Sequence, residues 1–213
     1  MPEHRLPAEH RAQRDFILLD GSGSMINKWH PMMDAIEAYV DTLARNGTQS
    51  FLTLSVFSTD ALGIDHCSVD IADWESLHEN PAQSTWGGTP LYDAINHMAR
   101  RLKDEDPIRC SITIVTDGRD NESQTSVVQA RAIIEWLRAK GWSVTFIGCD
   151  WNNSRLAAQL GLPEAAAIGV SQARLTDAAR NLATKRTRYA ATGAPMHWTD
   201  EEKEQFGGYL SHG

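Results

Sequence analysis

Short apolar runs alternate with longer amphipathic stretches along most of the chain. Runs rich in Val, Ile, Leu and Phe have the length of buried strands, and they occupy residues 15–20, 51–57, 109–117, 142–147 and 165–170. Between them, apolar residues recur at helical spacing, which predicts helices at residues 31–45, 90–103, 127–140, 154–160 and 171–189. Residues 64–71 alternate more loosely and predict an antiparallel edge strand beside residues 51–57. This alternation predicts an α/β fold with a doubly wound, mostly parallel sheet, one antiparallel edge strand and helices on both faces.

The pattern also divides the chain into three parts. Residues 1–14 are polar, contain two prolines and predict a loose N-terminal arm. Residues 15–189 form the predicted domain, and residues 190–213 form a C-terminal tail. A capping-box sequence, Thr199-Asp200-Glu201-Glu202, predicts a short helix in that tail, up to about Phe206. Trp198, Phe206 and Tyr209 pack on the domain or engage another chain. We favour the first because short isolated helices are marginal in water.

Residues 72–88 form a long connection without clear periodicity, which is uncommon unless the segment has a role. It contains Trp74, Leu77 and Trp86. Two interpretations stay open. Its aromatic side chains cover the edge of the sheet, or the segment shapes the rim of a binding pocket.

Composition limits the classes of protein to consider. The chain has 213 residues, of which 41% are hydrophobic, and a formal net charge of −8. The charge argues against a nucleic-acid surface, and no apolar run approaches the ~20 residues that span a bilayer. The N-terminus shows no apolar signal core, and Cys67, Cys110 and Cys149 are isolated, as buried thiols in a reducing compartment would be. We therefore expect a cytoplasmic protein.

Oxygen-bearing side chains follow the predicted strands at three places. Asp20, Ser22 and Ser24 come directly after the first strand, in a loop whose glycines permit a tight turn. Thr89 precedes the helix that begins near Pro90, and Asp117 follows the strand at residues 109–117. Strand ends of a parallel sheet meet at its carboxyl edge, where ligands bind. Carboxylates and hydroxyls are hard donors that suit Mg²⁺, Mn²⁺ or Ca²⁺, so these five side chains predict a metal site.

The three segments together resemble a known family. Asp-x-Ser-x-Ser at residues 20–24, a Gly-Gly-Thr turn at residues 87–89 and a strand ending Thr-Asp-Gly at residues 116–118 are similar to the metal-ion-dependent adhesion site (MIDAS) of von Willebrand factor A (vWA) domains. The resemblance runs from about Asp15 to Ile168 and is nearest to the bacterial, intracellular branch.

The resemblance implies a Rossmann-like vWA fold and a function. The metal ligands would be Asp20, Ser22, Ser24, Thr89 and Asp117, holding Mg²⁺ (or Mn²⁺/Ca²⁺) directly or through water. An Asp or Glu carboxylate of another protein would complete the coordination of the ion.

Each of these residues also has a purely structural interpretation. Ser22 and Ser24 are suited to cap the following helix, Thr89 to cap the helix at Pro90, and Asp117 to form a turn. Their joint occurrence at three strand ends favours the metal site.

We expect less direct roles for the neighbouring polar residues. Asp120 and Asn121 are either second-layer or rim residues of the site or part of a solvated loop, which we favour. Arg119 either meets an acidic residue of a partner or is a plain surface residue, which we favour. Asp93 lies in the first turn of its helix, where a carboxylate favours the dipole, and we do not predict it as a ligand.

The leading functional hypothesis is a metal-dependent protein-interaction module without enzymatic activity. The alternative is a metal-dependent hydrolase or phosphatase that uses Asp20. The sequence weakens this alternative because Ser22 stands where such phosphatases place a second acid, and no His or Lys is expected near the pocket. A nucleotide site is disfavoured because Gly21-Ser22-Gly23-Ser24 lacks the third glycine of the dinucleotide motif.

Overall fold

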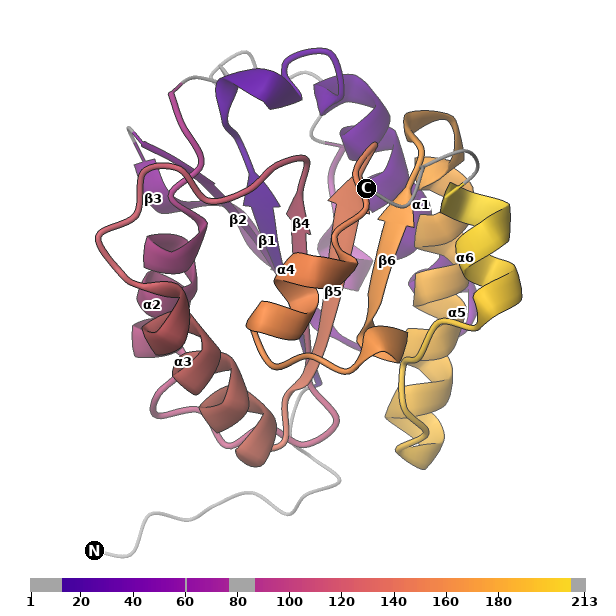
Figure 1. The fold of residues 1–213 in the computed structure, drawn as a ribbon. Helices are drawn as coiled ribbons and strands as arrows, with labels where there is room; N and C mark the ends of the chain where they lie inside the picture. The colour runs from indigo at the N-terminus through magenta and orange to yellow at the C-terminus, as the bar shows by residue number, and fades with distance from the viewer. Residues whose placement is uncertain (1–12, 60, 77–86, 208–213) are drawn as a thin grey trace, which may run out of the picture.

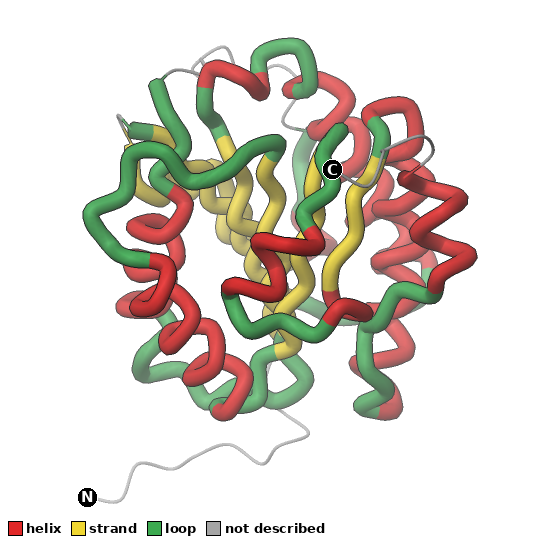
Figure 2. Tube along the Cα trace, viewed as in Figure 1, coloured by secondary structure: helices red, strands yellow, loops and turns green. Residues whose placement is uncertain are grey.

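A computed structural model describes residues 13–59, 61–76 and 87–207. Over these residues the chain forms one six-stranded sheet in the order β3-β2-β1-β4-β5-β6 (Figures 1 and 2). The strands are β1 Arg14–Asp20, β2 Phe51–Ser58, β3 Ala61–Asp70, β4 Ser111–Thr116, β5 Ser143–Cys149 and β6 Ala167–Val170. Neighbouring strands are parallel except β2 and β3, which pair antiparallel at the edge. The predicted doubly wound sheet with one antiparallel edge strand is therefore confirmed.

Helices cover both faces of this sheet (Figure 1). They are α1 Trp29–Arg45, α2 Leu91–Arg101, α3 Val127–Ala139, α4 Ser154–Gln159, α5 Leu175–Thr192 and α6 Asp200–Gly207. Side chains of β1 alternate between the two faces: Ile17 and Leu19 pack with α1 and α5, whereas Phe16 and Leu18 pack with α2, α3 and α4. Because β1 is buried on both faces, it reads as a continuous apolar run.

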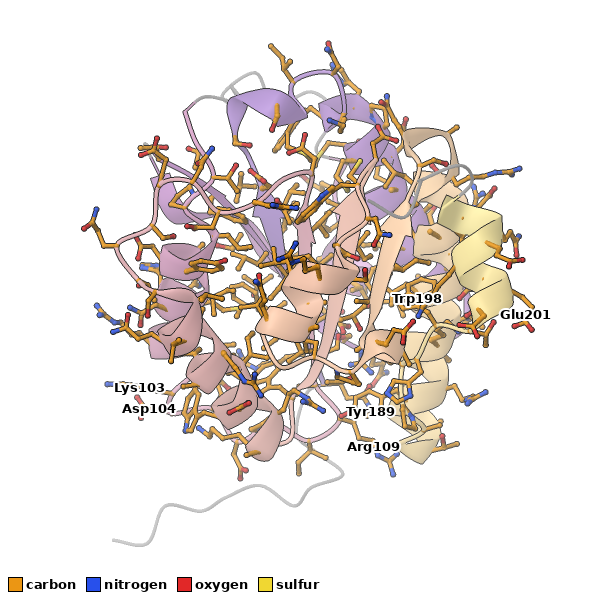
Figure 3. All side chains as sticks on the ribbon, viewed as in Figure 1. Lys103, Asp104, Arg109, Tyr189, Trp198 and Glu201 are labelled. Carbon is orange, nitrogen blue, oxygen red and sulfur yellow. The ribbon has the colours of Figure 1, made fainter. Side chains whose placement is uncertain are left out.

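The C-terminal tail packs back on the domain. Trp198 and Phe206 are both buried and meet edge to face with ring centroids 6.1 Å apart (Figure 3 labels Trp198 beside α6). The capping box forms as predicted: the Thr199 N–H donates to Glu202, and the Glu202 N–H donates to the Thr199 hydroxyl. Lys185 of α5 donates to both carboxylate oxygens of Glu202 at 2.8 Å, which ties α6 to α5. Tyr209 lies outside the described residues.

The end of α5 differs slightly from the prediction. The helix runs to Thr192, three residues past the predicted boundary at 189, and Gly193 ends it with φ of +77°. That left-handed conformation favours glycine, which explains why the helix stops there.

A buried ion pair joins α5 to the start of β1. Arg186 and Asp15 are 0% and 2% exposed, and the Arg186 Nε donates to Asp15 Oδ1. Ser50 and Ser111 also donate hydroxyl hydrogen bonds to the Asp15 carboxylate. This network lies at the amino ends of the parallel strands, opposite the edge where the predicted metal ligands follow their strands.

The long connection predicted at 72–88 is described only in part. A short 3-10 helix covers Ile71–Asp73, and Trp74 packs against the core formed with α1 and α5. Leu77 and Trp86 lie outside the described residues, as do residues 1–12 of the predicted arm.

Two further expectations concern thiols and membranes. Cys110 and Cys149 are free and buried, and the Cys67 side chain lies outside the described part of the chain. Among the helices that the structure describes, none is both long enough and apolar enough to cross a membrane.

Candidate metal site

Two of the predicted ligands are brought together by the register of adjacent strands. β1 and β4 pair in parallel, with Leu19 opposite Val115. Asp20 is the last residue of β1, and Asp117 directly follows β4. Both carboxylates therefore lie at the carboxyl edge of the sheet, which is at the top in Figure 1.

The Asp20 carboxylate is held rigidly. It is fully buried, its Oδ1 accepts the Ser22 N–H at 2.8 Å, and its Oδ2 accepts the Thr116 hydroxyl at 2.6 Å. Burial raises the pKa of Asp20, although the bonds from Thr116 and Ser22 oppose that shift, and the nearby Asp117 charge adds to it. Because burial disfavours the ionised form of Asp20, a cation beside this carboxylate would stabilise its charge.

Hydroxyl groups connect the first loop to Asp117. Ser22 Oγ lies 3.1 Å from Ser24 Oγ, and the Ser24 hydroxyl donates to Asp117 Oδ1 at 2.7 Å. Ser22 precedes the 3-10 helix Gly23–Met25, yet its side chain makes no capping bond there. The capping interpretation of Ser22 is therefore wrong, and its hydroxyl turns toward Ser24 instead.

The loop that carries Thr89 is fastened to both of its neighbours. The Gly23 N–H donates to the Gly87 carbonyl at 3.1 Å, which joins it to the first loop. The Thr89 N–H donates to Asn121 Oδ1 at 2.7 Å, and the Asn121 N–H donates back to the Thr89 carbonyl at 3.1 Å. A Cβ on Gly88 would approach the Asn121 Oδ1 to 2.7 Å, so this close contact requires glycine.

Thr89 itself is 4% exposed. Within the described residues, its hydroxyl makes no hydrogen bond with the other four predicted ligands. Pro90 rather than Thr89 occupies the N-cap position of α2, and that residue makes no side-chain capping bond. The interpretation of Thr89 as the cap of α2 is therefore wrong. Thr89 lies one residue before the N-cap, where its backbone is hydrogen-bonded to Asn121.

Polar residues of the loop after β4 attach it to the start of α2. Asp93 accepts the Gln124 and Thr125 N–H groups at 2.9 and 2.8 Å, and Asp120 accepts the Tyr92 N–H at 3.2 Å. The Asp93 carboxylate therefore fastens the loop after β4 to the first turn of α2. Asp120 is half-buried and Asn121 is exposed, so the favoured interpretation of a solvated loop holds, but both side chains also order the loop through these hydrogen bonds.

A lysine lies at the site, contrary to the prediction that no His or Lys would be near it. Lys28 Nζ lies 2.7 Å from Asp117 Oδ2 and 3.4 Å from the Ser24 carbonyl oxygen. Burial acts to lower the pKa of Lys28, but the hydrogen bond and charge of Asp117 outweigh it, and the pKa is raised. The prediction failed because α1 begins at Trp29, two residues before the predicted start. Lys28 is therefore the N-cap residue of α1, and its side chain reaches Ser24 and Asp117.

The donor set fits a hard divalent cation. Asp20, Ser22, Ser24 and Asp117 lie together at one corner of the sheet edge, and the loop that carries Thr89 is joined to this corner through its backbone. Carboxylate and hydroxyl oxygens suit Mg²⁺, Mn²⁺ or Ca²⁺. Elsewhere in the described chain, no cluster of three or more His, Cys, Asp or Glu residues is arranged to hold a metal.

Comparison with known proteins identifies the fold. Neither a protein-family model nor a curated protein sequence matches the chain. Its structure is similar to a von Willebrand factor type A protein from Catenulispora acidiphila, with a TM-score of 0.63 and 20% identity over 83% of this chain and 43% of that one. The chain has the vWA fold.

Two other vWA-fold structures indicate the range of proteins that share it. The pilus adhesin SpaC of Lactobacillus rhamnosus GG has a TM-score of 0.65 and 12% identity, over 84% of this chain and 30% of that one. Proximal thread matrix protein 1 of the mussel byssus, solved with a zinc-occupied MIDAS motif, has a TM-score of 0.55 and 17% identity, over 79% of this chain and 46% of that one. The present chain spans less than half the length of each of these three proteins.

The vWA fold accounts for the sheet and the loop positions, but the sequence did not predict two residues at the site. Thr116 binds Asp20, and Lys28 pairs with Asp117. Asn121, which the sequence offered as a second-layer residue, holds Thr89. Thr116 directly precedes Asp117, so a search for hydrogen-bonding neighbours would have found it. Lys28 had a signal too, since it lies four residues after Ser24, but its direction depends on where α1 begins.

Proposed function

We propose that this chain is a metal-dependent protein-interaction module. Asp20, Ser22, Ser24, Thr89 and Asp117 would hold one divalent cation, with Mg²⁺ as the first candidate and Mn²⁺ or Ca²⁺ as substitutes. When bound, the ion supplies an electrophilic position for a carboxylate. The ligand would be an Asp or Glu side chain of another protein.

One observation carries this proposal: the hydrogen-bonded path from Ser22 through Ser24 to Asp117, which joins the ends of two adjacent strands. A structural turn requires no such convergence of hydroxyls on a carboxylate. The zinc-occupied MIDAS of the mussel protein supports the assignment by analogy of fold. The adhesin among the similar structures supports protein binding in the same way.

Thermal unfolding tests the metal part. At a concentration of about 100 times Kd, a bound cation stabilises the folded state by ~2.7 kcal/mol, which is roughly 5–10 °C for a domain of this size. We expect that gain for wild type in MgCl₂ or MnCl₂ relative to EDTA, and little gain for Ser22→Ala. Ser154→Ala is the matched control because that hydroxyl, 2.8 Å from Asn152 Oδ1, lies in α4 away from the site. Equal gains in all three proteins would contradict the assignment.

Affinity capture tests the partner part. Proteins retained by the wild-type chain in Mg²⁺ should be released by EDTA and should not bind Asp20→Ala. Retention that is unchanged by EDTA would contradict metal-mediated recognition.

The hydrolase hypothesis gains one observation from the structure, because Lys28 places beside Asp117 a cationic side chain that the sequence did not predict at the site. Ser22 still stands where a second acid would be needed. Turnover of a phosphate ester that disappears in Asp20→Ala would favour this alternative over the interaction module.

A further inference from the structure

Lys28 occupies an unusual position for a surface lysine. It is the N-cap residue of α1, and its side chain makes no capping bond with that helix. Instead the ammonium donates to Asp117 Oδ2 at 2.7 Å, and the side chains of Lys28 and Asp117 are only 19% and 2% exposed. Both oxygens of the Asp117 carboxylate are thereby engaged, Oδ1 by Ser24 and Oδ2 by Lys28.

The lysine changes the charge of the site. Asp20 and Asp117 together carry −2, and Lys28 brings that sum to −1. A divalent cation then leaves the loaded site at +1, whereas the same site without the lysine would be neutral. Two cations that share one withdrawn carboxylate also repel each other strongly, because solvent screens them poorly.

We propose that Lys28 is a tethered cation that competes with the divalent ion for Asp117. It weakens metal binding and gives the metal-loaded site a net positive charge, which selects an anionic ligand. Lys28 is therefore a specificity-determining residue. This inference rests on the proposed metal site and concerns how strongly that site holds its ion.

A purely structural ion pair would behave differently. If Lys28 only fastened Asp117 in place, its removal would loosen the ligand and weaken metal binding. If it competes with the ion, its removal strengthens metal binding although the protein without metal becomes less stable. The direction of the change in affinity separates the two roles.

The test is calorimetric titration of the full chain, stripped with EDTA and dialysed, with MnCl₂ alone. Lys28→Met removes the charge and keeps most of the aliphatic stem, and we expect it to bind Mn²⁺ about fivefold tighter or more. Lys28→Arg keeps the charge, and Lys103→Met removes a charge at the far end of the domain (Figure 3). Lys28→Arg should stay nearer to wild type than Lys28→Met because it keeps the competing charge. Lys103→Met should stay within about twofold of wild type because distant exposed charges are screened.

Thermal unfolding supplies a second signature. In EDTA, Lys28→Met should melt below wild type, because Asp117 has lost its cation, and saturating MnCl₂ should close or reverse that difference. If Lys28→Met does not fold, Lys28→Gln, which donates a hydrogen bond without charge, takes its place.

The outcomes separate the two proposals. If wild type binds Mn²⁺ as tightly as the uncharged variant or more tightly, the proposed role of Lys28 is overturned, but the proposed metal site is not. An absence of Mn²⁺ binding in both proteins overturns the metal site and this inference with it. Binding by Lys28→Met but not by wild type would support both.

Discussion

Replacement of Arg186 by methionine should destabilise the domain severely. Arg186 is fully buried, and its Nε donates to the Asp15 carboxylate, which is itself only 2% exposed. Burial acts to lower the pKa of Arg186, but the charge of Asp15 outweighs it and the pKa is raised. Without the guanidinium, the buried carboxylate would have lost its cation and would keep uncharged hydroxyl donors such as Ser50 and Ser111. Breaking a buried pair on one side costs about 3–5 kcal/mol.

For a domain of this size, that loss lowers the melting temperature by about 6–20 °C. Urea unfolding followed by circular dichroism measures the free energy directly. Arg180→Met is the control on the same helix, because its ion pair with Asp177 is half exposed and should contribute about 1 kcal/mol or less. The double variant Asp15→Leu, Arg186→Met should recover much of the loss, since apolar replacements leave no buried charge. A loss below about 1 kcal/mol in Arg186→Met would refute the reasoning.

Three further predictions concern loops and thiols. Asn121→Ala removes the bond that positions Thr89 and should weaken Mn²⁺ binding about fivefold to tenfold in a calorimetric titration, and an unchanged affinity would show that the Asn121 contact is dispensable. Burial raises the pKa of Asp93, but hydrogen bonds from the loop outweigh it and leave the pKa below its ordinary 3.8. Asp93→Asn should therefore lose about 1–2 kcal/mol of unfolding free energy at neutral pH, a difference that fades as the pH falls below 3.8 through the folded-state pKa. Asp104→Asn, at an exposed position, should show neither effect, and a pH-independent loss in Asp93→Asn would contradict the role of its charge. Burial raises the pKa of Cys149 to about 12, so iodoacetamide should spare it in the native protein and label it in urea, as peptide mapping would show.

The sequence was most informative where burial alone sets the pattern. The run Phe16–Leu19 is apolar at every position because β1 is covered by helices on both faces. The helix at α1 was visible for the related reason that only one of its faces meets the sheet, which leaves a periodic pattern. These features depend on local spacing, and local spacing is what a sequence records.

The contacts that were missed depend on three-dimensional placement. Asp15 and Arg186 are 171 positions apart in the chain, and no local sequence pattern around either residue indicates that the two side chains meet. Lys28 is close to the metal-site motif in sequence, but its orientation follows from the first residue of α1, and helix ends are the least predictable part of a helix. Asn121 was underestimated because loops rich in Asp, Asn and Ser are usually solvated.

The candidate ligands themselves were predicted from chemistry and order along the chain. Asp20 and Asp117 end adjacent parallel strands, so their approach follows once the sheet is correctly ordered. Thr89 lies on a loop that no strand register fixes, and its position depends on Asn121. The assignment of these residues as metal ligands stays a prediction, as does the nearness to bacterial intracellular vWA domains.

Anomalous diffraction at the manganese edge, from crystals grown with MnCl₂, tests the central claim most directly. The account predicts one Mn²⁺ peak at the carboxyl edge of the sheet, with oxygen atoms of Asp20, Ser22, Ser24, Thr89 and Asp117 around it directly or through water. A peak elsewhere, or none at this edge, would contradict it.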